Sequence, residues 1–304
     1  MIADPSPWFL RRWLRVGVLG LVLCGCGSDL NVGSDVLWAT DLETGDLSDW
    51  YAPPAPGGGL FPDPSNSPPP TIVSSPAHSG RYSLKFTDLA KSDLTGPGVY
   101  RELIAPPDAY YSAWYFIPRL YETHSQWTIL KFRSRSGEDM DVINHGHDLN
   151  LRTLPGGQVV LYVFSHDPEY LQAPLADPPA FVPVETWFQI EVLFRPRTDE
   201  TGKILVWLDD RLVYDLENRR TSGSNDVFWT PCDVGEDVVP FGQPGTMDGT
   251  AGASGADGTD SGADSAAGAS ATSAATESGP ELYIDDAAIS LKRVTREGTI
   301  LIRR

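Results

Sequence analysis

The chain has 304 residues and a formal net charge of −18, because 23 Lys and Arg residues stand against 41 Asp and Glu residues. A surface this acidic repels nucleic-acid phosphates, so we expect no nucleic-acid partner. Only three cysteines are present, Cys24, Cys26 and Cys232, and the first two share a short segment near the start. This composition excludes a disulfide-rich scaffold, so a hydrophobic core has to stabilise the fold.

The first 25 residues have the composition of a secretory signal peptide. Arg11, Arg12 and Arg15 precede an apolar run over 16–23. A basic segment, a brief apolar segment and small residues at the cleavage site are the parts of such a signal. The apolar run is shorter than the ~20 residues of a transmembrane helix, which argues against a membrane-spanning anchor.

The segment Leu23-Cys24-Gly25-Cys26 resembles the lipobox of bacterial lipoproteins. The resemblance implies cleavage before Cys26 and acylation of that cysteine, including by palmitate. Cys24 fits less well, because the bulky Leu23 precedes it where a small residue is typical. Several acyl chains on one residue exceed the two hydrophobic signals that stable anchoring requires.

The resemblance also implies a cellular location. Gly27 follows the cysteine where an aspartate would favour the inner membrane, so we expect a lipid-anchored protein of the bacterial outer membrane. Residues 26–34 would then form a short tether. The sequence leaves open whether the anchored domain faces the periplasm or the exterior.

Two segments of low complexity interrupt the rest of the chain. Residues 52–70 are rich in Pro and Gly and predict a long loop. Residues 245–279 are almost all Gly, Ala, Ser, Thr and Asp, and cannot bury enough apolar surface to fold, so we expect disorder. A strand-like segment over 281–291 follows. We therefore expect one domain over 35–295 that contains both segments, with 296–304 as a C-terminal tail or edge strand.

Strand-like segments fill the remainder. They are rich in Val, Ile, Tyr, Trp and Phe and cover 110–117, 126–134, 158–164, 187–195 and 203–209. Phe188, Ile190, Val192 and Phe194 alternate with polar residues, a period of two that predicts one buried and one solvated face. The pattern predicts an all-β antiparallel domain, and favours a sandwich over a barrel.

Three motifs suggest a family. They read Trp187-Phe-Gln-Ile-Glu-Val, Gly202-Lys-Ile-Leu-Val-Trp-Leu-Asp-Asp210 and Leu212-Val-Tyr-Asp215. Together they resemble the strand–turn–strand unit of concanavalin A-like jelly rolls, which include lectins, glucanases and polysaccharide lyases. The segments Asp41-Leu-Glu-Thr-Gly-Asp-Leu-Ser-Asp-Trp50 and Leu282-Tyr-Ile-Asp-Asp286 are similar to the first and last strands of such domains, which lie side by side. The resemblance implies a jelly-roll β-sandwich with a carbohydrate ligand.

Within this superfamily the layout is nearest to the heparin-lyase and alginate-lyase branches. Tyr100-Arg101-Glu102-Leu103 resembles the "RxEL"-type strand of these enzymes, whose arginine binds a uronate carboxylate. The resemblance implies that Arg101 binds substrate and takes part in catalysis. The family's histidine-bearing strand has no counterpart at 126–133, and its closing "YxKxGxY" strand is absent. These departures favour binding without catalysis.

A second candidate site lies on the segment 126–134. If this strand alternates regularly, Trp127, Ile129, Lys131 and Arg133 share one face. An aromatic ring and two cations suit a sugar acid, because the ring packs on C–H groups and the guanidinium binds a carboxylate. The alternative is an exposed face whose cations only aid solubility.

The only histidine cluster is Asn144-His145-Gly146-His147. His145 or His147 could serve a lyase as the catalytic base, since histidine titrates near neutral pH, or join a metal site. The alternative, which we favour, is a polar turn between two strands.

Three carboxylates suggest a structural Ca²⁺ ion. Glu43, Asp285 and Asp286 belong to the predicted first and last strands, and carboxylate oxygens suit this ion. Because adjacent strand residues face opposite ways, we expect only one of Asp285 and Asp286 to point inward. The alternative is a set of ordinary acidic edge residues.

Three functional hypotheses follow. The first is a cell-envelope lipoprotein whose jelly-roll domain binds polysaccharide without catalysis. The second is a divergent polysaccharide lyase that cleaves a uronate-containing glycan by β-elimination. The third is a structural or adhesion lipoprotein without a glycan site. The sequence leaves the oligomeric state and the identity of the glycan open.

Overall fold

The structure is a computed structural model, and it describes eleven parts of the chain. These are residues 35–51, 57–61, 69–87, 98–104, 108–123, 127–136, 139–165, 175–223, 226–233, 238–240 and 280–294. The predicted signal peptide, Cys26, the tether, the whole low-complexity segment 245–279 and the predicted tail 296–304 lie outside the described residues.

The described residues form one short helix and a series of strands. The helix α1 spans Ser48–Tyr51. The strands are β1 (Val36–Thr40), β2 (Gly57–Phe61), β3 (Thr71–Val73), β4 (Ser83–Phe86), β5 (Gly98–Ile104), β6 (Ala109–Phe116), β7 (Tyr121–Thr123), β8 (Trp127–Ser136), β9 (Asp139–Thr153), β10 (Val159–Ser165), β11 (Phe181–Val182), β12 (Phe188–Arg195), β13 (Gly202–Leu208), β14 (Arg211–Arg219), β15 (Asp226–Asp233), β16 (Val238–Pro240) and β17 (Leu282–Ser290).

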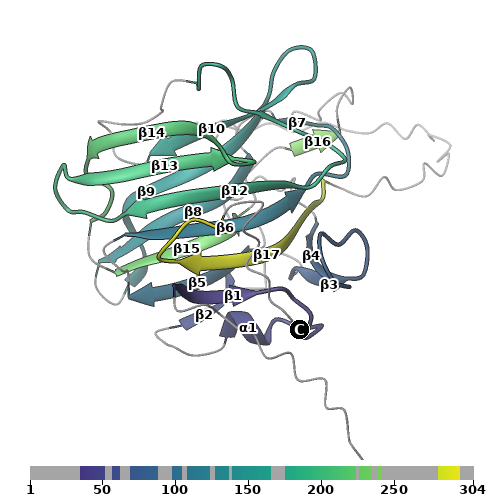
Figure 1. The fold of residues 1–304 in the computed structure, drawn as a ribbon, viewed down its shortest axis with the longest axis horizontal. Helices are drawn as coiled ribbons and strands as arrows, with labels where there is room; N and C mark the ends of the chain where they lie inside the picture. Colours follow the sequence, from purple (N-terminus) through teal and green to yellow (C-terminus); the bar gives the residue numbers. More distant parts are fainter. Residues whose placement is uncertain are drawn as a thin grey trace, which may run out of the picture.

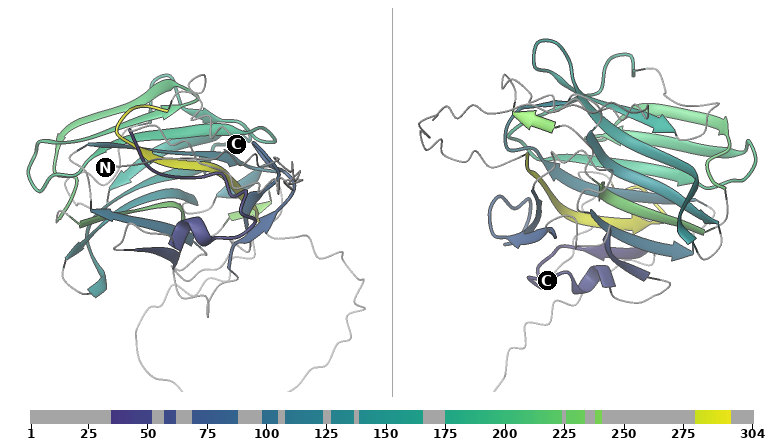
Figure 2. Two further views of the ribbon diagram at one scale, coloured as in Figure 1. Left: turned by 60° about the horizontal axis from the view of Figure 1, so that its bottom comes forward. Right: turned by 180° about the vertical axis from the view of Figure 1, so that it is seen from behind.

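Two antiparallel sheets pack face to face (Figure 1). Sheet A has the order β14-β13-β12-β6-β17-β4-β3, with β1 also paired to β17, and sheet B has the order β11-β10-β9-β8-β15-β5-β2. A two-stranded ribbon joins β7 and β16. Sheet A lies in front in Figure 1, and sheet B comes forward in the rear view of Figure 2. The predicted antiparallel jelly-roll β-sandwich is confirmed.

Apolar side chains on the inner faces build the core. In β12, Phe188, Ile190, Val192 and Phe194 are all buried, as the period-two pattern predicts. The ring of Phe194 stacks on Phe132 of β8 with centroids 4.2 Å apart, which joins the two sheets directly. Burial of such large side chains is the main favourable contribution to folding.

The last described strand, β17, brings distant parts of the chain together. It pairs with β6 on one side, and with both β4 and β1 on the other. The first and last strands therefore lie side by side, as predicted, but the prediction that 41–50 forms the first strand is wrong: this motif follows β1 as a turn and the helix α1. Strand pairing between residues this far apart in sequence raises the contact order, which slows folding.

The prediction of a loop over 52–70 is wrong for residues 57–61. Residues Gly57–Phe61 form β2, which pairs with β5 at the edge of sheet B. The backbone hydrogen bonds of this edge position outweigh the low strand propensity of three consecutive glycines.

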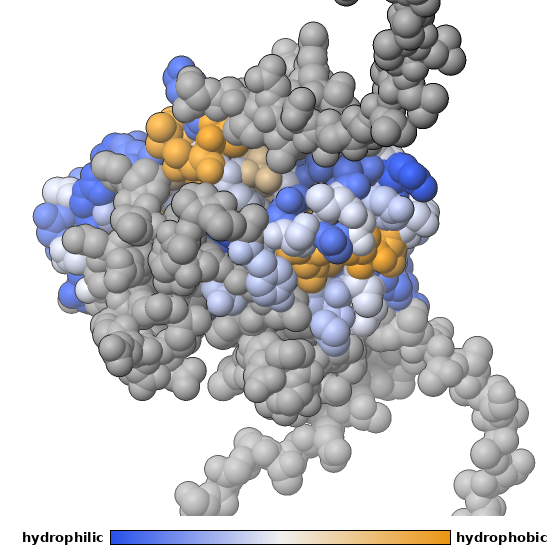
Figure 3. Space-filling model, turned by 90° about the horizontal axis from the view of Figure 1, so that it is seen from below, coloured by the Kyte–Doolittle hydropathy of each residue, from blue (hydrophilic) through white to orange (hydrophobic). Residues whose placement is uncertain are grey.

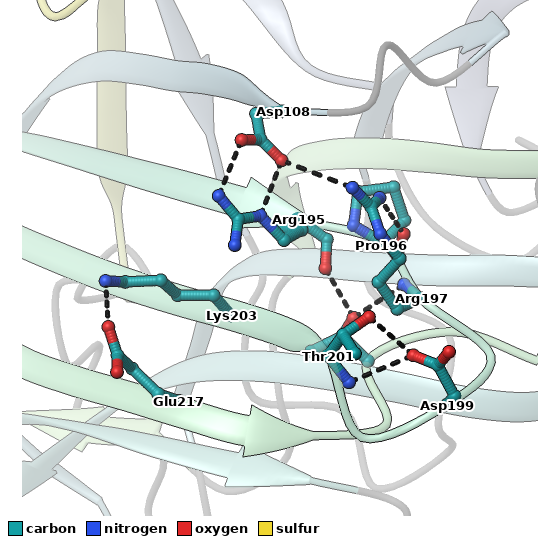
Figure 4. A network of polar contacts seen from close by, with 9 residues as sticks. Asp108, Arg195, Pro196, Arg197, Asp199, Thr201, Lys203 and Glu217 are labelled. Carbon is teal, nitrogen blue, oxygen red and sulfur yellow. Dashed lines mark hydrogen bonds and ion pairs between the residues drawn. The ribbon is translucent and has the colours of Figure 1, made fainter.

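A polar network fixes the turn between β12 and β13 (Figure 4). Arg195 donates two hydrogen bonds to the Asp108 carboxylate, at 2.7 and 2.8 Å. Thr221 donates to the Arg195 carbonyl at 2.6 Å and accepts from the Arg197 backbone N–H at 2.9 Å. Within the turn, the Asp199 carboxylate accepts from the Thr201 N–H at 2.9 Å. These hydrogen bonds hold the turn in place.

The face seen from below in Figure 3 carries apolar residues as small separate groups among polar ones. Leu37 and Leu291 are exposed large apolar residues near the β1–β17 pair, where the Leu291 N–H donates to the Asp35 carbonyl at 2.6 Å. Isolated apolar side chains of this kind are normal on soluble domains. In the described residues, no helix has the length and apolar character to cross a membrane.

A buried arginine links the helix to the core. Arg101 of β5 is 1% exposed, and its Nη1 donates to the Trp50 carbonyl at 3.0 Å. Its guanidinium lies 5.7 Å from the Trp38 ring, and Trp38 in turn packs on Trp50 with centroids 4.6 Å apart. Burial lowers the pKa of Arg101, since the charged form loses hydration. The arginine therefore holds α1 against the strands β1 and β5.

We predict that Arg101→Ala lowers the free energy of unfolding by roughly 2–5 kcal/mol, because it opens a cavity and leaves the Trp50 carbonyl without its donor. Urea denaturation would measure this loss. The matched control Arg211→Ala removes an exposed arginine, and its effect should stay within about 0.5 kcal/mol. Equal stabilities of the two variants would contradict the structural role of Arg101.

Candidate functional site

A bulge in β8 determines which side chains face away from the core. Thr128 pairs with Asn150 of β9, and Leu130 pairs with Leu149, so Ile129 is an extra residue. One extra residue reverses which side chains face inward and which face outward along the strand on one side of it. Trp127 therefore faces inward together with Leu130 and Phe132, and the predicted shared face of Trp127, Lys131 and Arg133 is wrong.

Lys131 and Arg133 lie on the outer face of sheet B. They pair in register with Asp148 and Gly146 of β9. Arg133 Nη1 donates to the Asp148 carboxylate, and both side chains are buried despite their outward position. Gly146 makes room for the guanidinium, since a Cβ there would lie 2.6 Å from Arg133 Nη1. A Cβ at the glycine of the predicted histidine cluster would therefore displace the guanidinium from its present position.

A second polar row lies beside this pair, and the sequence reasoning missed it. Thr128, Asn150 and Tyr162 are paired in register across β8, β9 and β10. All three side chains are buried, and Asn150 is 0% exposed. The alternation Asp148-Leu149-Asn150-Leu151 was the available signal, because it gives β9 one apolar and one polar face.

The Asn150 amide is not satisfied within the protein. Neither its Nδ2 nor its Oδ1 has a hydrogen-bond partner. It lies close enough to the Tyr162 hydroxyl to lower the pKa of that group, against the larger effect of burial, which raises the pKa. The pair nevertheless lacks the geometry of a hydrogen bond. An unsatisfied buried amide costs roughly 1–3 kcal/mol per group, so it needs an explanation.

The predicted catalytic residues do not join this face. Arg101 pairs in register with Trp229, which pairs with Phe132, so Arg101 lies on the inner face and packs on Trp38 and Trp50. His147 pairs with Phe132 and is 1% exposed, with its ring 6.1 Å from that of Phe194. Both side chains therefore lie in the core, away from Lys131 and Arg133, and their contact with substrate stays a prediction.

Trp127 likewise lies in the core, and its substrate-binding role stays a prediction. Its side chain is fully buried, and its ring packs edge-on against Tyr121 with centroids 5.5 Å apart. The favoured interpretation of 144–147 as a turn is also wrong, because these residues belong to the continuous strand β9. The side chain of His145 lies outside the described part of the structure.

Part of the outer face of sheet A is covered by the chain itself. After β17 the yellow chain turns back across the sheet (Figure 1). Arg293 donates to Glu191 at 2.7 Å and to Asp210 at 3.1 Å, and stacks over Trp207 at 4.4 Å. Gln189 Nε2 donates to the Val294 carbonyl at 3.0 Å. We call residues 291–294 the C-terminal strap; it satisfies the polar side chains that β12 presents on this face.

The three predicted calcium ligands hold a loop. The Asp285 carboxylate accepts from the backbone N–H groups of His78 and Ser79 at 2.9 and 3.3 Å. Asp286 accepts from Ser79 Oγ at 2.9 Å and lies 2.6 Å from His78 Nδ1. Asp285 and Asp286 therefore contact the same loop, against the expectation of opposite faces, because the β17–β6 register shifts after Asp285.

Glu43 acts in the same way on the next part of this loop. Its Oε1 accepts from the N–H groups of Arg81 and Tyr82 at 2.5 and 3.0 Å. Among the described residues, no group of three or more His, Cys, Asp and Glu side chains is arranged to hold a metal. The structural Ca²⁺ ion stays a prediction.

Comparison with known proteins gives structural neighbours only. No protein-family model and no curated protein sequence matches the chain. An alginate lyase, Aly36B, in complex with an alginate trisaccharide is 11% identical, with a TM-score of 0.49 over 84% of this chain and 98% of that chain. An endo-β-1,4-glucuronan lyase from the fungus Trichoderma reesei is 13% identical, with a TM-score of 0.45 over 84% and 96%. The cellulose-induced protein Cip1 is 15% identical, with a TM-score of 0.47 over 84% and 98%.

These neighbours include polysaccharide lyases, the class whose layout the sequence motifs resemble. At such identities a similar fold does not transfer an activity, so function has to follow from the side chains of this chain.

The Asp285 carboxyl predicts a pH dependence of stability. Burial, and then the charge of Asp286, raise its pKa from 3.8 to about 8. Since the folded pKa lies above the unfolded one, the stabilisation is complete below about pH 4 and is lost as the pH rises through 8. We expect the free energy of unfolding to decline over this range by at most about 1.4 kcal/mol per pH unit.

Urea denaturation between pH 4 and 9 in the presence of EDTA measures this decline. Asp285→Asn, which cannot ionise, should flatten it, whereas the exposed control Asp215→Asn should keep it. A wild-type slope retained in Asp285→Asn would show that another group causes the dependence.

Proposed function

We propose that the protein binds polysaccharide on the outer face of sheet B, without catalysing its cleavage. The observation that carries this proposal is the set of polar side chains gathered there by three neighbouring strands. The set comprises Thr128, Lys131 and Arg133 of β8, Asp148 and Asn150 of β9, and Tyr162 of β10.

The chemistry of this face suits a sugar polymer. Lys131 is half-buried and offers a cation, and Tyr162 combines an apolar ring with a hydroxyl group. Strands β8 to β10 run alongside one another, so the polar rows repeat across the sheet and suit an extended ligand. On the outer face of sheet A, the strap satisfies the buried side chains of Gln189 and Glu191.

Binding is favoured over catalysis because the catalytic set predicted from the lyase resemblance is divided. Lys131 and Arg133 lie on the outer face, whereas Arg101 and His147 lie between the sheets. A lyase needs its carboxylate-binding group and its base at the same sugar unit.

We predict that Lys131→Ala weakens binding to an acidic polysaccharide about tenfold, equivalent to ~1.4 kcal/mol. Alginate and glucuronan are suitable acidic polymers, and affinity electrophoresis or calorimetry measures the change. Wild-type binding should weaken as salt is added. This dependence on salt should be smaller in Lys131→Ala, because a charge contact is removed.

The matched control for this experiment is Lys203→Ala. Lys203 lies on the opposite sheet, where it pairs with Glu217, so its loss should leave the affinity unchanged. Equal weakening by both substitutions would indicate a general charge effect and contradict the assignment to sheet B. Absence of binding to every polysaccharide would favour the structural or adhesion hypothesis.

A second candidate function is β-elimination of a uronate-containing polysaccharide. One observation favours it: Lys131 and Tyr162, two groups able to transfer a proton, share the outer face of sheet B. Because burial raises the pKa of Tyr162, its hydroxyl is protonated near neutral pH and suits an acid better than a base. Absorbance from unsaturated uronates tests this function, and a signal abolished by Tyr162→Phe would establish it over simple binding.

We further propose that acylated Cys26 anchors the domain to the bacterial outer membrane, on the strength of the lipobox pattern. In a bacterial host with lipoprotein processing, the wild-type protein should incorporate labelled palmitate and sediment with membranes. Cys26→Ser should abolish both results, whereas the neighbouring control Cys24→Ser should leave them unchanged. Loss of labelling in Cys24→Ser alone would move the anchor to that cysteine.

A further inference from the structure

Five aromatic rings form a continuous row on the outer face of sheet A. Their centroids lie 3.7 Å apart for His78 and Trp114, 5.6 Å for His78 and Trp187, 5.4 Å for Trp187 and Phe116, and 6.0 Å for Phe116 and Tyr283. They come from the β3–β4 loop (His78), β6 (Trp114 and Phe116), the residue before β12 (Trp187) and β17 (Tyr283). We call these five residues the ring cluster.

The ring cluster lies outside the core and reaches solvent. In β6, Trp114 and Phe116 stand on either side of Tyr115, which belongs to the core between the sheets. The side chain of His78 is 24% exposed, and Trp114, Phe116 and Trp187 are partly exposed as well. Large aromatic side chains gathered at the surface of a soluble domain indicate a place where a partner binds.

The strap covers the neighbouring part of this face. It binds Gln189 and Glu191 of β12, and Gln189 pairs in register with Trp114. Phe116 and Tyr283 pair in register one outward row further along β6 and β17. The chain itself thus covers two polar side chains of this face, while the rings beside them remain partly in contact with solvent.

The charged groups at both ends of the ring cluster have partners within the protein. At one end, Lys85 lies over the Tyr283 ring at 5.6 Å and pairs with Glu281 at 2.7 Å. At the other end, the Asp286 carboxylate lies 2.6 Å from His78 Nδ1. An acidic ligand would compete with Glu281 for Lys85 and would meet the like charge of Asp286, so the ends of the cluster disfavour it.

We propose that the ring cluster binds an uncharged polysaccharide, whose sugar rings stack on Trp187 and its neighbours. The C–H face of a pyranose is apolar and packs on an aromatic ring, and its hydroxyl groups can bond polar atoms at the edge. A row of rings across β17, β6 and the start of β12 suits a ligand made of repeated sugar units. This site goes beyond the proposed binding on sheet B, since it lies on the opposite sheet and takes a ligand of different charge.

The decisive comparison is between Trp187→Leu and Trp187→Phe. Leucine keeps an apolar side chain without an aromatic face, so binding to soluble hydroxyethylcellulose should weaken roughly tenfold. Phenylalanine keeps a ring, so its binding should stay within about threefold of wild type. Affinity electrophoresis measures both. The matched control Tyr51→Leu removes a ring that is 53% exposed on α1, outside the cluster, and should leave binding unchanged. Equal binding by Trp187→Leu and wild type would overturn the proposal.

Fluorescence gives a second measurement that does not depend on the stability of the leucine variant. Tryptophan emission of the wild-type protein should change when hydroxyethylcellulose is added, and Trp187→Phe should lose part of this change. An identical change in Trp187→Phe would count against stacking on Trp187.

A competition experiment separates this site from sheet B. Alginate in excess should leave wild-type protein bound to insoluble cellulose, because the two faces point away from each other. Displacement by alginate would overturn the separate site. Wild-type protein that binds alginate but neither cellulose polymer would leave the proposed function standing and overturn the ring cluster as a glycan site. Binding of the cellulose polymers alone would support the ring cluster and contradict the assignment to sheet B.

Two further outcomes would give the ring cluster a different occupant. A wild-type dimer that Trp187→Leu converts to a monomer, measured by analytical ultracentrifugation, would assign the cluster to a second copy of this chain. Cellulose binding that appears only after removal of residues 295–304 would assign it to the chain's own end. Either result would overturn the proposal for the full chain.

Discussion

The register of β8 against β9 is the constraint on which the candidate site depends. A single extra residue at Ile129 places Trp127 in the core and turns Lys131 and Arg133 outward. Without the bulge, the alternation would bring Trp127 to the same face as the two cations. Because a strand has a period of two, one inserted residue exchanges the buried and the exposed sets on one side of it.

The inner faces show how the sandwich accommodates polar residues that the sequence places among apolar ones. The Arg101 guanidinium lies over the Trp38 ring and donates to the Trp50 carbonyl, so its buried charge is compensated by a ring face and a hydrogen bond. Its role is to fasten α1 onto the strands. An arginine that a sequence motif assigns to substrate binding can thus serve packing, and only the register reveals on which face it lies.

Most of the fold could be predicted from the sequence, and the site only in part. The alternation of Phe188, Ile190, Val192 and Phe194 predicts β12 because the sheet interior is uniformly apolar there. The bulge at Ile129 could not be predicted from the residues of β8 alone, since pairing with β9 sets its position. Strand β2 was missed because its stability comes from β5, against the preference of Gly57, Gly58 and Gly59. Asn150 and Tyr162 meet only through strand pairing, so no local motif indicates them together.

Buried polar groups need hydrogen-bond partners on both outer faces of the sandwich, but the two faces differ in where the partners come from. On sheet A, Glu191 is 2% exposed and receives hydrogen bonds from Arg293 and from the Val294 backbone. The folded chain itself therefore supplies what that face needs. On sheet B, Arg133 and Asp148 satisfy each other, but the amide of Asn150 has no partner of its own. Natural structures satisfy nearly all buried polar groups, and exceptions concentrate where a ligand or water completes the site. The binding face proposed on sheet B thus rests on side chains of this chain itself and not on its similarity to lyases.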